Sequence, residues 1–239
     1  MLYSILKPVF WLLAHILCRF RVSGRQNIPR TGPVLVVSNH LIWYDPILLG
    51  VIFPRRLWFM AKIEIFRLPL VGLGCRLTGQ IPVHRGESDR AALEMALDYL
   101  RKGRALAIFP EGRVARHERL LQAHTGAAML ALRAGVPILP VAHTGTRRIF
   151  IGRRAWLPRV DVCIGEPYVP EVPEGLSRKA AFKLVTENLM LRIADMMPDA
   201  ERGSYAMLTS TPPLEGEREA VQLDRELKET PAAHQPELE

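Results

Sequence analysis

Short apolar runs alternate with longer amphipathic stretches along most of the chain. The apolar runs are rich in Val, Ile, Leu and Phe, which favours buried strands, and they occupy residues 33–38, 57–61, 79–85, 105–109, 136–143 and 159–165. The amphipathic stretches indicate helices and occupy residues 45–53, 88–103, 122–135 and 177–197. This alternation predicts an α/β fold, with a layered, mostly parallel or mixed sheet that is flanked by helices.

Two of the expected helices carry clear boundary signals. Residues 88–103 begin at Ser88 or Asp89, either of which can cap a helix, and they end at Gly103. The last helix begins in the same way, at Ser177. These caps support a helical interpretation of both segments.

The N-terminal segment, residues 1–25, predicts a helix that associates with a membrane. Four residues recur at intervals of four and can therefore share one side of a helix: Lys7, Trp11, His15 and Arg19. Most other positions are apolar, but the longest run without a charged residue extends only from Pro8 to Cys18, which is too short to span a bilayer. We expect an amphipathic helix in the bilayer interface, and a helix packed on the core of the domain is the alternative.

Charge is distributed unevenly along the chain. The first acidic residue is Asp45, whereas eight acids and three bases give residues 214–239 a net charge of −5. Because the whole chain has a formal net charge of +8, the preceding part carries +13, which suits an anionic surface. No nucleic-acid-binding motif accompanies these bases, so we expect membrane lipids as partners and no nucleic acid. We divide the chain into the membrane-associating segment 1–25, one domain at 26–202, and an acidic tail at 203–239 that we expect to be disordered.

Two motifs resemble sites of other kinds but lack a defining residue. Residues 72–77 begin like a dinucleotide-binding loop without its third glycine, so we expect a tight turn there, near the membrane face. Residues 117–124 hold Leu121 where a zinc-binding H-E-x-x-H helix needs its second histidine, so no metal site is predicted. The three cysteines lie far apart without CxxC spacing, which argues against a disulfide framework and indicates a reducing compartment.

His40 and Asp45 lie five positions apart in the stretch VVSNHLIWYDP. On a continuous helix they would lie about 140° apart and could not easily meet. Pro46 disfavours helical geometry at Asp45, so the strand should end near Ser38, His40 should lie in a loop, and Asp45 should begin the next helix. That reversal can bring the carboxylate beside the imidazole, where it would fix the tautomer and leave the other nitrogen as a general base. A loop histidine beside an ordinary helix cap is the alternative.

Further polar residues follow other predicted strands. Glu111 and Arg113 come directly after the strand at 105–109, and Lys62 and Arg85 lie at the ends of two others. Ligands of α/β sheets tend to bind at strand ends, and the planar guanidinium of arginine suits phosphate. No serine elbow and no cysteine in a catalytic context is present, so we expect the substrate to supply the nucleophile, most simply a hydroxyl.

Four motifs together resemble a known family. NHLIWYDP, GQIPVHR, FPEGR and VPILPV occur in the order of the four sequence blocks of the glycerolipid acyltransferases, and the chain is most similar to the 1-acyl-glycerol-3-phosphate (lysophosphatidate) acyltransferase branch. The resemblance implies transfer of a fatty acyl group from acyl-CoA or acyl-carrier protein, as co-substrate, to the free hydroxyl of 1-acyl-glycerol-3-phosphate. The product would be phosphatidic acid for phospholipid synthesis, made without a metal or redox cofactor at the cytoplasmic face of a membrane.

The resemblance also assigns roles to individual residues. His40 would be the general base and Asp45 its orienting partner. Five further residues would contact the acceptor phosphate or shape the acceptor site: Lys62, Arg85, Glu111, Gly112 and Arg113. His84 stands where an acid often precedes the arginine of the second block, which leaves the acceptor open. Alternatives are acylation of another lysophospholipid or of glycerol-3-phosphate, hydrolysis with water as acceptor, and a non-catalytic membrane-binding module.

Overall fold

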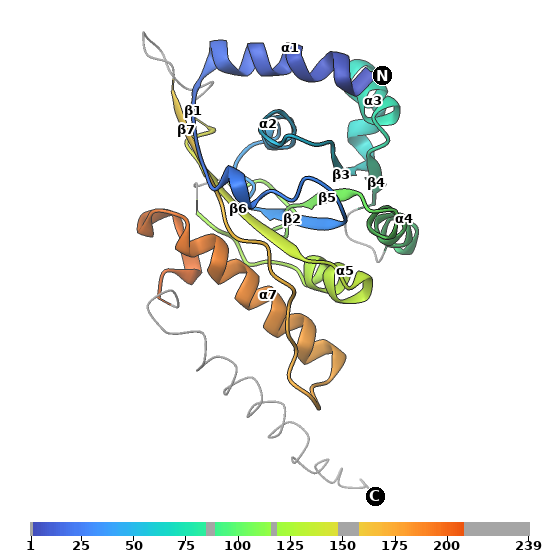
Figure 1. Ribbon diagram of the computed structural model, residues 1–239, viewed down its shortest axis with the longest axis vertical. Helices are drawn as coiled ribbons and strands as arrows, with labels where there is room; N and C mark the ends of the chain where they lie inside the picture. Colours follow the sequence, from blue (N-terminus) through green and yellow to red (C-terminus); the bar gives the residue numbers. More distant parts are fainter. Residues whose placement is uncertain (1, 85–88, 116–118, 148–157, 208–239) are drawn as a thin grey trace, which may run out of the picture.

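A computed structural model describes residues 2–84, 89–115, 119–147 and 158–207 of the chain. Within these residues, seven strands form one sheet in the order β1-β7-β6-β2-β5-β3-β4 (Figure 1). The strands are β1 (Arg19–Ser23), β2 (Val34–Ser38), β3 (Leu57–Lys62), β4 (Ile81–Val83), β5 (Ala105–Ile108), β6 (Ile138–Thr144) and β7 (Arg159–Ile164). Only β6 and β7 pair in antiparallel fashion, so the expected mixed, mostly parallel sheet is confirmed.

Helices cover both faces of this sheet. They are α1 (Leu2–Leu17), α2 (Asp45–Ile52), α3 (Pro69–Leu77), α4 (Arg90–Arg101), α5 (Gly126–Ala134) and α7 (Arg178–Asp195). Figure 1 shows α2, with α1 beyond it, on one face, and α5 and α7 on the other. The arrangement is the layered α/β architecture that the alternating pattern predicts.

The central strand β2 shows why the sheet is covered on both faces. All five of its residues are buried, and successive side chains point to opposite sides. Val34 and Val36 pack in the core that α2 shares with β7, whereas Leu35 and Val37 pack in the core formed with α4, α5 and α7. A strand that is buried on both faces is a continuous apolar run, as this one is.

Local signals set the helix boundaries on the second face. The carboxylate of Asp89 accepts a hydrogen bond from the Ala92 N–H at 2.9 Å and begins α4. The hydroxyl of Ser177 accepts from the Ala180 N–H and begins α7. Gly135 ends α5 in the left-handed conformation, with φ 62°.

The N-terminal segment contains a strand as well as a helix, so its expected extent of 1–25 is wrong. The helix α1 ends at Leu17, and residues 19–23 form β1, which pairs in parallel with β7. Exposed residues alternate with partly buried ones along RFRVS, and this period of two is that of a strand. Arg19 therefore lies beyond the helical stripe, whereas Lys7 lies within α1 and its ammonium donates to the Phe53 carbonyl at the C-terminus of α2.

Two other boundaries differ from expectation. Residues 72–77 belong to α3 and do not form a tight turn. The folded domain extends beyond 202, because the Tyr205 side chain is buried in the core beneath α7 and Gly203 lies against the Leu120 backbone. Residues 208–239 of the expected acidic tail lie outside the described residues.

Candidate active site

The parallel strands β6, β2, β5, β3 and β4 bring their C-terminal ends to one side of the sheet, which we call the site edge. The loop after β2 carries His40, and the loop after β5 carries Glu111 and Arg113. Lys62 is the last residue of β3 and pairs in register with Val83 of β4. Adjacent strands lie about 4.8 Å apart, so the end of β3 is about 10 Å from the end of β2. The predicted site residues that the structure describes therefore gather along the site edge.

His40 and Asp45 meet as the chain reversal predicts. The His40 Nδ1 lies 2.9 Å from Asp45 Oδ2, and both side chains are buried, with exposed fractions of 8% and 0%. An ionised carboxylate only accepts hydrogen bonds, so Nδ1 carries the proton and donates it. The Nε2 of His40 is thus the nitrogen with a free lone pair, as a general base requires.

The Asp45 carboxylate is held by the loop that precedes it. Its Oδ2 also accepts from the backbone N–H groups of Leu41 at 2.7 Å and Ile42 at 2.8 Å. Burial by itself raises the pKa of Asp45, but nearby His143 and the hydrogen bonds from His40 and Ile42 outweigh it and hold the pKa below its usual value. Asp45 is therefore an anion at neutral pH and stabilises a positive charge on the imidazole.

Glu111 ties the His40 loop to the loop after β5. Its Oε1 accepts from the His40 N–H at 2.9 Å, and its Oε2 accepts from the Leu121 N–H at 3.0 Å. Burial raises the pKa of Glu111 to about 7, although both N–H groups act in the opposite direction. In a second link, the Ala115 N–H donates to the His40 carbonyl at 2.7 Å. Glu111 thus positions the backbone of the base, a contact that the sequence alone does not specify.

The FPEGR motif also packs against the base directly. The Phe109 ring stacks on the His40 imidazole, with 4.2 Å between ring centroids and 20° between planes. Gly112 ends the turn with φ 66°, and a Cβ there would lie 3.0 Å from the ring of His124. A side chain at this position would be strained by the positive φ and by the close approach to His124, which explains the glycine after Glu111.

A second buried histidine, His143, lies behind Asp45, and no motif in the sequence indicates it. The His143 Nε2 lies 2.8 Å from the Asn39 carbonyl and 3.6 Å from Asp45 Oδ2. The Asn39 side chain also bonds the backbone N–H and carbonyl of His143, at 2.9 Å each, which locks β6 to the His40 loop. Burial lowers the pKa of His143, so its ring is neutral at neutral pH. The sequence signal is the single polar residue at the end of the apolar run 136–143.

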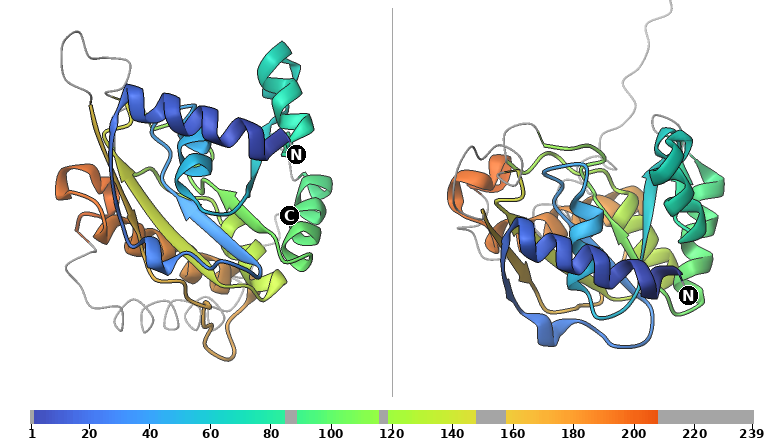
Figure 2. Two further views of the ribbon diagram at one scale, coloured as in Figure 1. Left: turned by 45° about the horizontal axis from the view of Figure 1, so that its top comes forward. Right: turned by 90° about the horizontal axis from the view of Figure 1, so that it is seen from above.

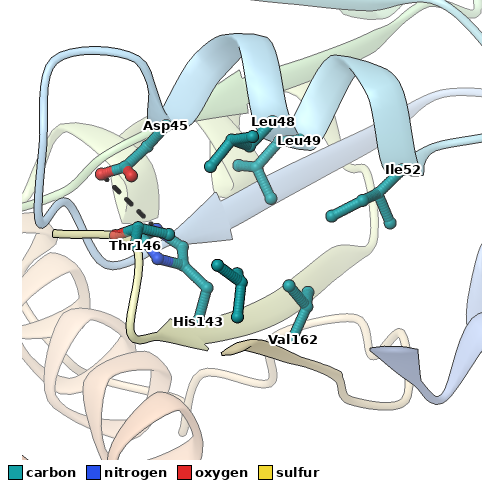
Figure 3. Close-up of a pocket in the computed structure, with 8 residues that line it drawn as sticks. Asp45, Leu48, Leu49, Ile52, His143, Thr146 and Val162 are labelled. Carbon is teal, nitrogen blue, oxygen red and sulfur yellow. Dashed lines mark ion pairs between the residues drawn. The ribbon is translucent and has the colours of Figure 1, made fainter. Parts of the chain in front are cut away.

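Figure 3 shows this side of the site. His143 points toward Asp45, while Leu48, Leu49 and Ile52 of α2 line a narrow pocket between α2 and the sheet that has no room for a water molecule. The apolar lining keeps the Asp45 carboxylate away from water. That environment strengthens its interaction with His40.

The basic residues stand farther from the pair. Arg113 is exposed, two residues beyond Glu111 in the same loop. The Lys62 ammonium pairs with Glu64 at 3.0 Å, and both side chains are about half exposed. Arg85 lies outside the described residues, directly after His84 at the end of β4. Among the residues that the structure describes, no three His, Cys, Asp or Glu side chains are grouped to hold a metal ion.

A second histidine–aspartate pair has the same spacing. The ring Nδ1 and the backbone N–H of His84 both bond Asp89 Oδ2, at 3.1 Å and 2.9 Å. The His84 side chain is 63% exposed, however, and Asp89 also caps α4. The H-x4-D spacing is therefore a local turn geometry, and burial distinguishes the pair His40–Asp45.

The comparisons with known proteins agree with this geometry. A family model described as acyltransferase matches residues 19–144, which include β1 to β6 and the loops that carry His40 and Glu111. The chain belongs to the acyltransferase family. The matched residues include the loops that carry the candidate site, so family membership and candidate site lie in the same part of this acyltransferase.

Curated relatives of the acyltransferase carry two different activity names. It is 31% identical over 153 residues to the 1-acyl-sn-glycerol-3-phosphate acyltransferase of Borreliella burgdorferi, across 63% of this chain and 60% of that protein. It is 34% identical over 163 residues to the enzyme of that name from Streptococcus pneumoniae, across 64% and 59%. It is 38% identical over 137 residues to the lyso-ornithine lipid O-acyltransferase of Pseudomonas aeruginosa, across 55% and 51%. The matches thus span between 51% and 60% of these relatives' own lengths.

A crystal structure has the same fold. It is that of the 1-acyl-sn-glycerophosphate (LPA) acyltransferase PlsC from Thermotoga maritima, with a TM-score of 0.62 and 25% sequence identity. The similarity covers 81% of this chain and 80% of that one. It therefore extends beyond the family model and includes most of the described acyltransferase.

Proposed function

We propose that this protein transfers a fatty acyl group from an acyl thioester to the free hydroxyl of 1-acyl-glycerol-3-phosphate and produces phosphatidic acid. The observation that carries the proposal is the buried His40–Asp45 hydrogen bond of 2.9 Å, which leaves Nε2 of His40 as a base at the site edge. Basic side chains along the site edge, Lys62 and Arg113, support an acceptor with a phosphate group. The donor is acyl-CoA or acyl-carrier protein.

The proposed reaction needs one base and no protein nucleophile. Nε2 of His40 takes the proton of the acceptor hydroxyl while that oxygen forms a bond to the thioester carbonyl carbon. Asp45 stabilises the resulting imidazolium through Nδ1–H. The tetrahedral intermediate collapses as the carbon–sulfur bond breaks, and the thiolate takes the proton back from His40. Proton transfer and bond changes balance without a metal or redox cofactor.

We also place the enzyme at the cytoplasmic face of a membrane. The described side chains of α1 are mostly apolar and exposed, and only Ala14 among them is buried, against α2. Trp11 and His15 stack on one side of this helix, with ring centroids 4.0 Å apart. Among the described residues, no helix is both long and apolar enough to cross a bilayer. A helix lying in the interface of an anionic leaflet accounts for these features.

A lyso-ornithine lipid is the second candidate acceptor. The Pseudomonas relative with this activity is 38% identical, compared with 31% and 34% for the two lysophosphatidate enzymes described above. His84 stands where an acid often precedes the second-block arginine, and this difference leaves the identity of the acceptor open. The base and its aspartate would act in the same way on either hydroxyl.

Thiol release by the purified protein distinguishes the candidates. Acyl-CoA and acyl-carrier protein are each offered with lysophosphatidate, another lysophospholipid, glycerol-3-phosphate, a lyso-ornithine lipid or no acceptor. We expect turnover with lysophosphatidate alone or in clear preference. Turnover confined to the lyso-ornithine lipid would establish the second candidate. Thiol release without any acceptor would indicate a hydrolase and contradict both.

A further inference from the structure

The helix α3 presents an apolar surface that no part of the described protein covers. Five large apolar side chains on α3 and its N-terminal cap are between 46% and 84% exposed: Leu68, Leu70, Val71, Leu73 and Leu77. The buried residue of the helix is Gly72, which lies against the Phe66 backbone. A helix that packs through a glycine and exposes its leucines has the reverse of the pattern that water favours.

The charges around α3 identify the kind of surface that would cover it. The segment 65–77 contains two arginines, Arg67 and Arg76, and no acidic residue, and Glu64, just before it, is paired with Lys62 at 3.0 Å. The Arg76 guanidinium donates to the Phe66 carbonyl, which holds it at the junction between α3 and the short 3-10 helix Ile63–Arg67, and Arg67 is exposed. Exposed leucines beside fixed positive charges complement an anionic lipid surface, in which acyl chains accept the former and phosphates the latter.

The position of α3 points to the same partner. It follows β3 at the site edge, which carries His40, and Figures 1 and 2 show it beside the N-terminal end of α1. Trp43 and Ile47, in the loop and helix that follow His40, are exposed as well. A single interfacial helix leaves the domain free to rotate about the helix axis. A second contact away from that axis removes this freedom and turns the site edge toward the lipid.

We propose that α3 is a second membrane-binding element, which inserts Leu70, Leu73 and Leu77 into the interface of an anionic bilayer beside α1. The inference rests on the proposed association of α1 with a membrane and adds the surface that orients the active site. It requires neither the proposed acceptor nor the proposed donor, because lipid binding is measured without either.

Co-sedimentation with lipid vesicles tests the proposal. The vesicles contain phosphatidylcholine with phosphatidylglycerol, or phosphatidylcholine alone. Leu70→Glu is the main variant, because this side chain is 84% exposed and its replacement is expected to leave the melting temperature unchanged. Val169→Glu is the matched control. Val169 is 62% exposed and follows Tyr168. Tyr168 pairs with Ile138, the first residue of β6, at the opposite end of the strands from His40.

We expect Leu70→Glu to weaken binding to the anionic vesicles about tenfold, and Val169→Glu to bind as the unsubstituted protein does. Leu77→Glu, a second exposed position on the same helix, should act like Leu70→Glu.

Equal binding by Leu70→Glu and Val169→Glu would overturn the role of α3 while leaving association through α1 intact. Dimerisation of the unsubstituted protein in the absence of lipid, abolished by Leu70→Glu, would instead identify α3 as a contact between two copies and overturn the proposal. Failure of the unsubstituted protein to bind any vesicle would overturn both membrane proposals without bearing on acyl transfer.

Discussion

The two histidine–aspartate pairs of this chain share a spacing but differ in their surroundings. In each pair an aspartate accepts from a ring Nδ1 five residues earlier, at 2.9 Å for Asp45 and 3.1 Å for Asp89. Only Asp45 is wholly buried, and only His40 is stacked on an aromatic ring and tied through its backbone to a buried carboxyl. Low exposure strengthens the ion pair, whereas water screens it at His84.

The matched substitutions His40→Ala and His84→Ala test this difference. We expect His40→Ala to lower turnover at saturating acceptor by about 10³-fold or more, because the base is lost. We expect His84→Ala to keep turnover at saturating acceptor close to that of the unsubstituted protein. Thiol release gives the rates, and circular dichroism shows that both variants fold. Near-normal turnover of a folded His40→Ala variant would exclude His40 as the base.

Glu111 makes stability depend on pH in a defined direction. Its pKa is raised to about 7 in the folded protein, compared with 4.5 for an ordinary glutamate, so the unfolded chain releases this proton first as pH rises. The free energy of unfolding contributed by Glu111 therefore falls between these two pH values, by up to about 3 kcal/mol. We expect the stability of the protein relative to Glu111→Gln to decrease by this amount from acidic to neutral pH.

Urea unfolding at several pH values measures this difference. His143 also titrates differently in the folded and unfolded states, but it is present in both proteins and cancels in the comparison. A difference between the two proteins that is constant across the range would show that Glu111 ionises normally in the fold.

At the scale of elements, two glycines of α3 are expected to respond oppositely to alanine. A Cβ at Gly72 would lie 2.2 Å from the Phe66 carbonyl oxygen, so Gly72→Ala must push α3 away from the preceding 3-10 helix. Nothing lies within 4 Å of a Cβ at Gly74. We expect Gly72→Ala to destabilise the protein by about 2 kcal/mol and Gly74→Ala to stabilise it by up to about 1 kcal/mol. Thermal unfolding measures both changes, and equal melting temperatures would contradict the packing of Gly72.

The sequence predicts elements where one local pattern dominates. The strand β2 and the caps of α4 and α7 follow from an apolar run and from Asp89 and Ser177. The strand β1 and the helix α3 do not follow, because each depends on contacts distant in sequence. β1 is fixed by pairing with β7, and α3 is fixed by the fit of Gly72 on Phe66. The helical start of the chain concealed the short period-two pattern of β1.

Contacts within the site can be predicted from the sequence only where the two residues are close along the chain. The pair His40–Asp45 lies within one reversal of the chain, so Pro46 and the spacing suffice to predict its contact. His143 comes from β6, and its position behind Asp45 is set by the strand order, which periodicity cannot give. The role of Glu111 was implied by family resemblance, but its two hydrogen bonds are properties of the folded loops.

At the scale of the whole molecule, the two proposed membrane-binding helices bear on how the candidate active site meets a lipid. Five parallel strands (β6, β2, β5, β3 and β4) end at the site edge, where His40 lies, and α3 follows β3 on that side. The acceptor is a lipid in either proposed reaction, so its hydroxyl must reach Nε2 of His40 from the bilayer interface. The proposed binding through two helices would present the base to the interface in one orientation, which would reduce the motion needed before each reaction.

Net charge is the second property of the whole molecule that governs this encounter. The whole chain has a net charge of +8, and residues 214–239 contribute −5 to it. Ending the chain after Pro213 therefore raises the net charge to +13. The shortened protein should bind anionic vesicles several-fold more tightly at low salt, because attraction between protein and lipid increases with its charge. The difference should largely disappear at about 1 M salt, where charges are screened beyond about 3 Å.

A chain of full length whose eight acids and three bases after residue 213 are all changed to Asn or Gln is the matched control, since it also carries +13 and keeps the segment. Both variants should bind alike, and neither should differ from the unsubstituted protein on vesicles of phosphatidylcholine alone. If the shortened protein gains affinity and the neutralised one does not, the segment opposes binding through its bulk. If neither gains affinity, the acidic residues do not affect binding, which would mean that they lie farther from the membrane than the screening length.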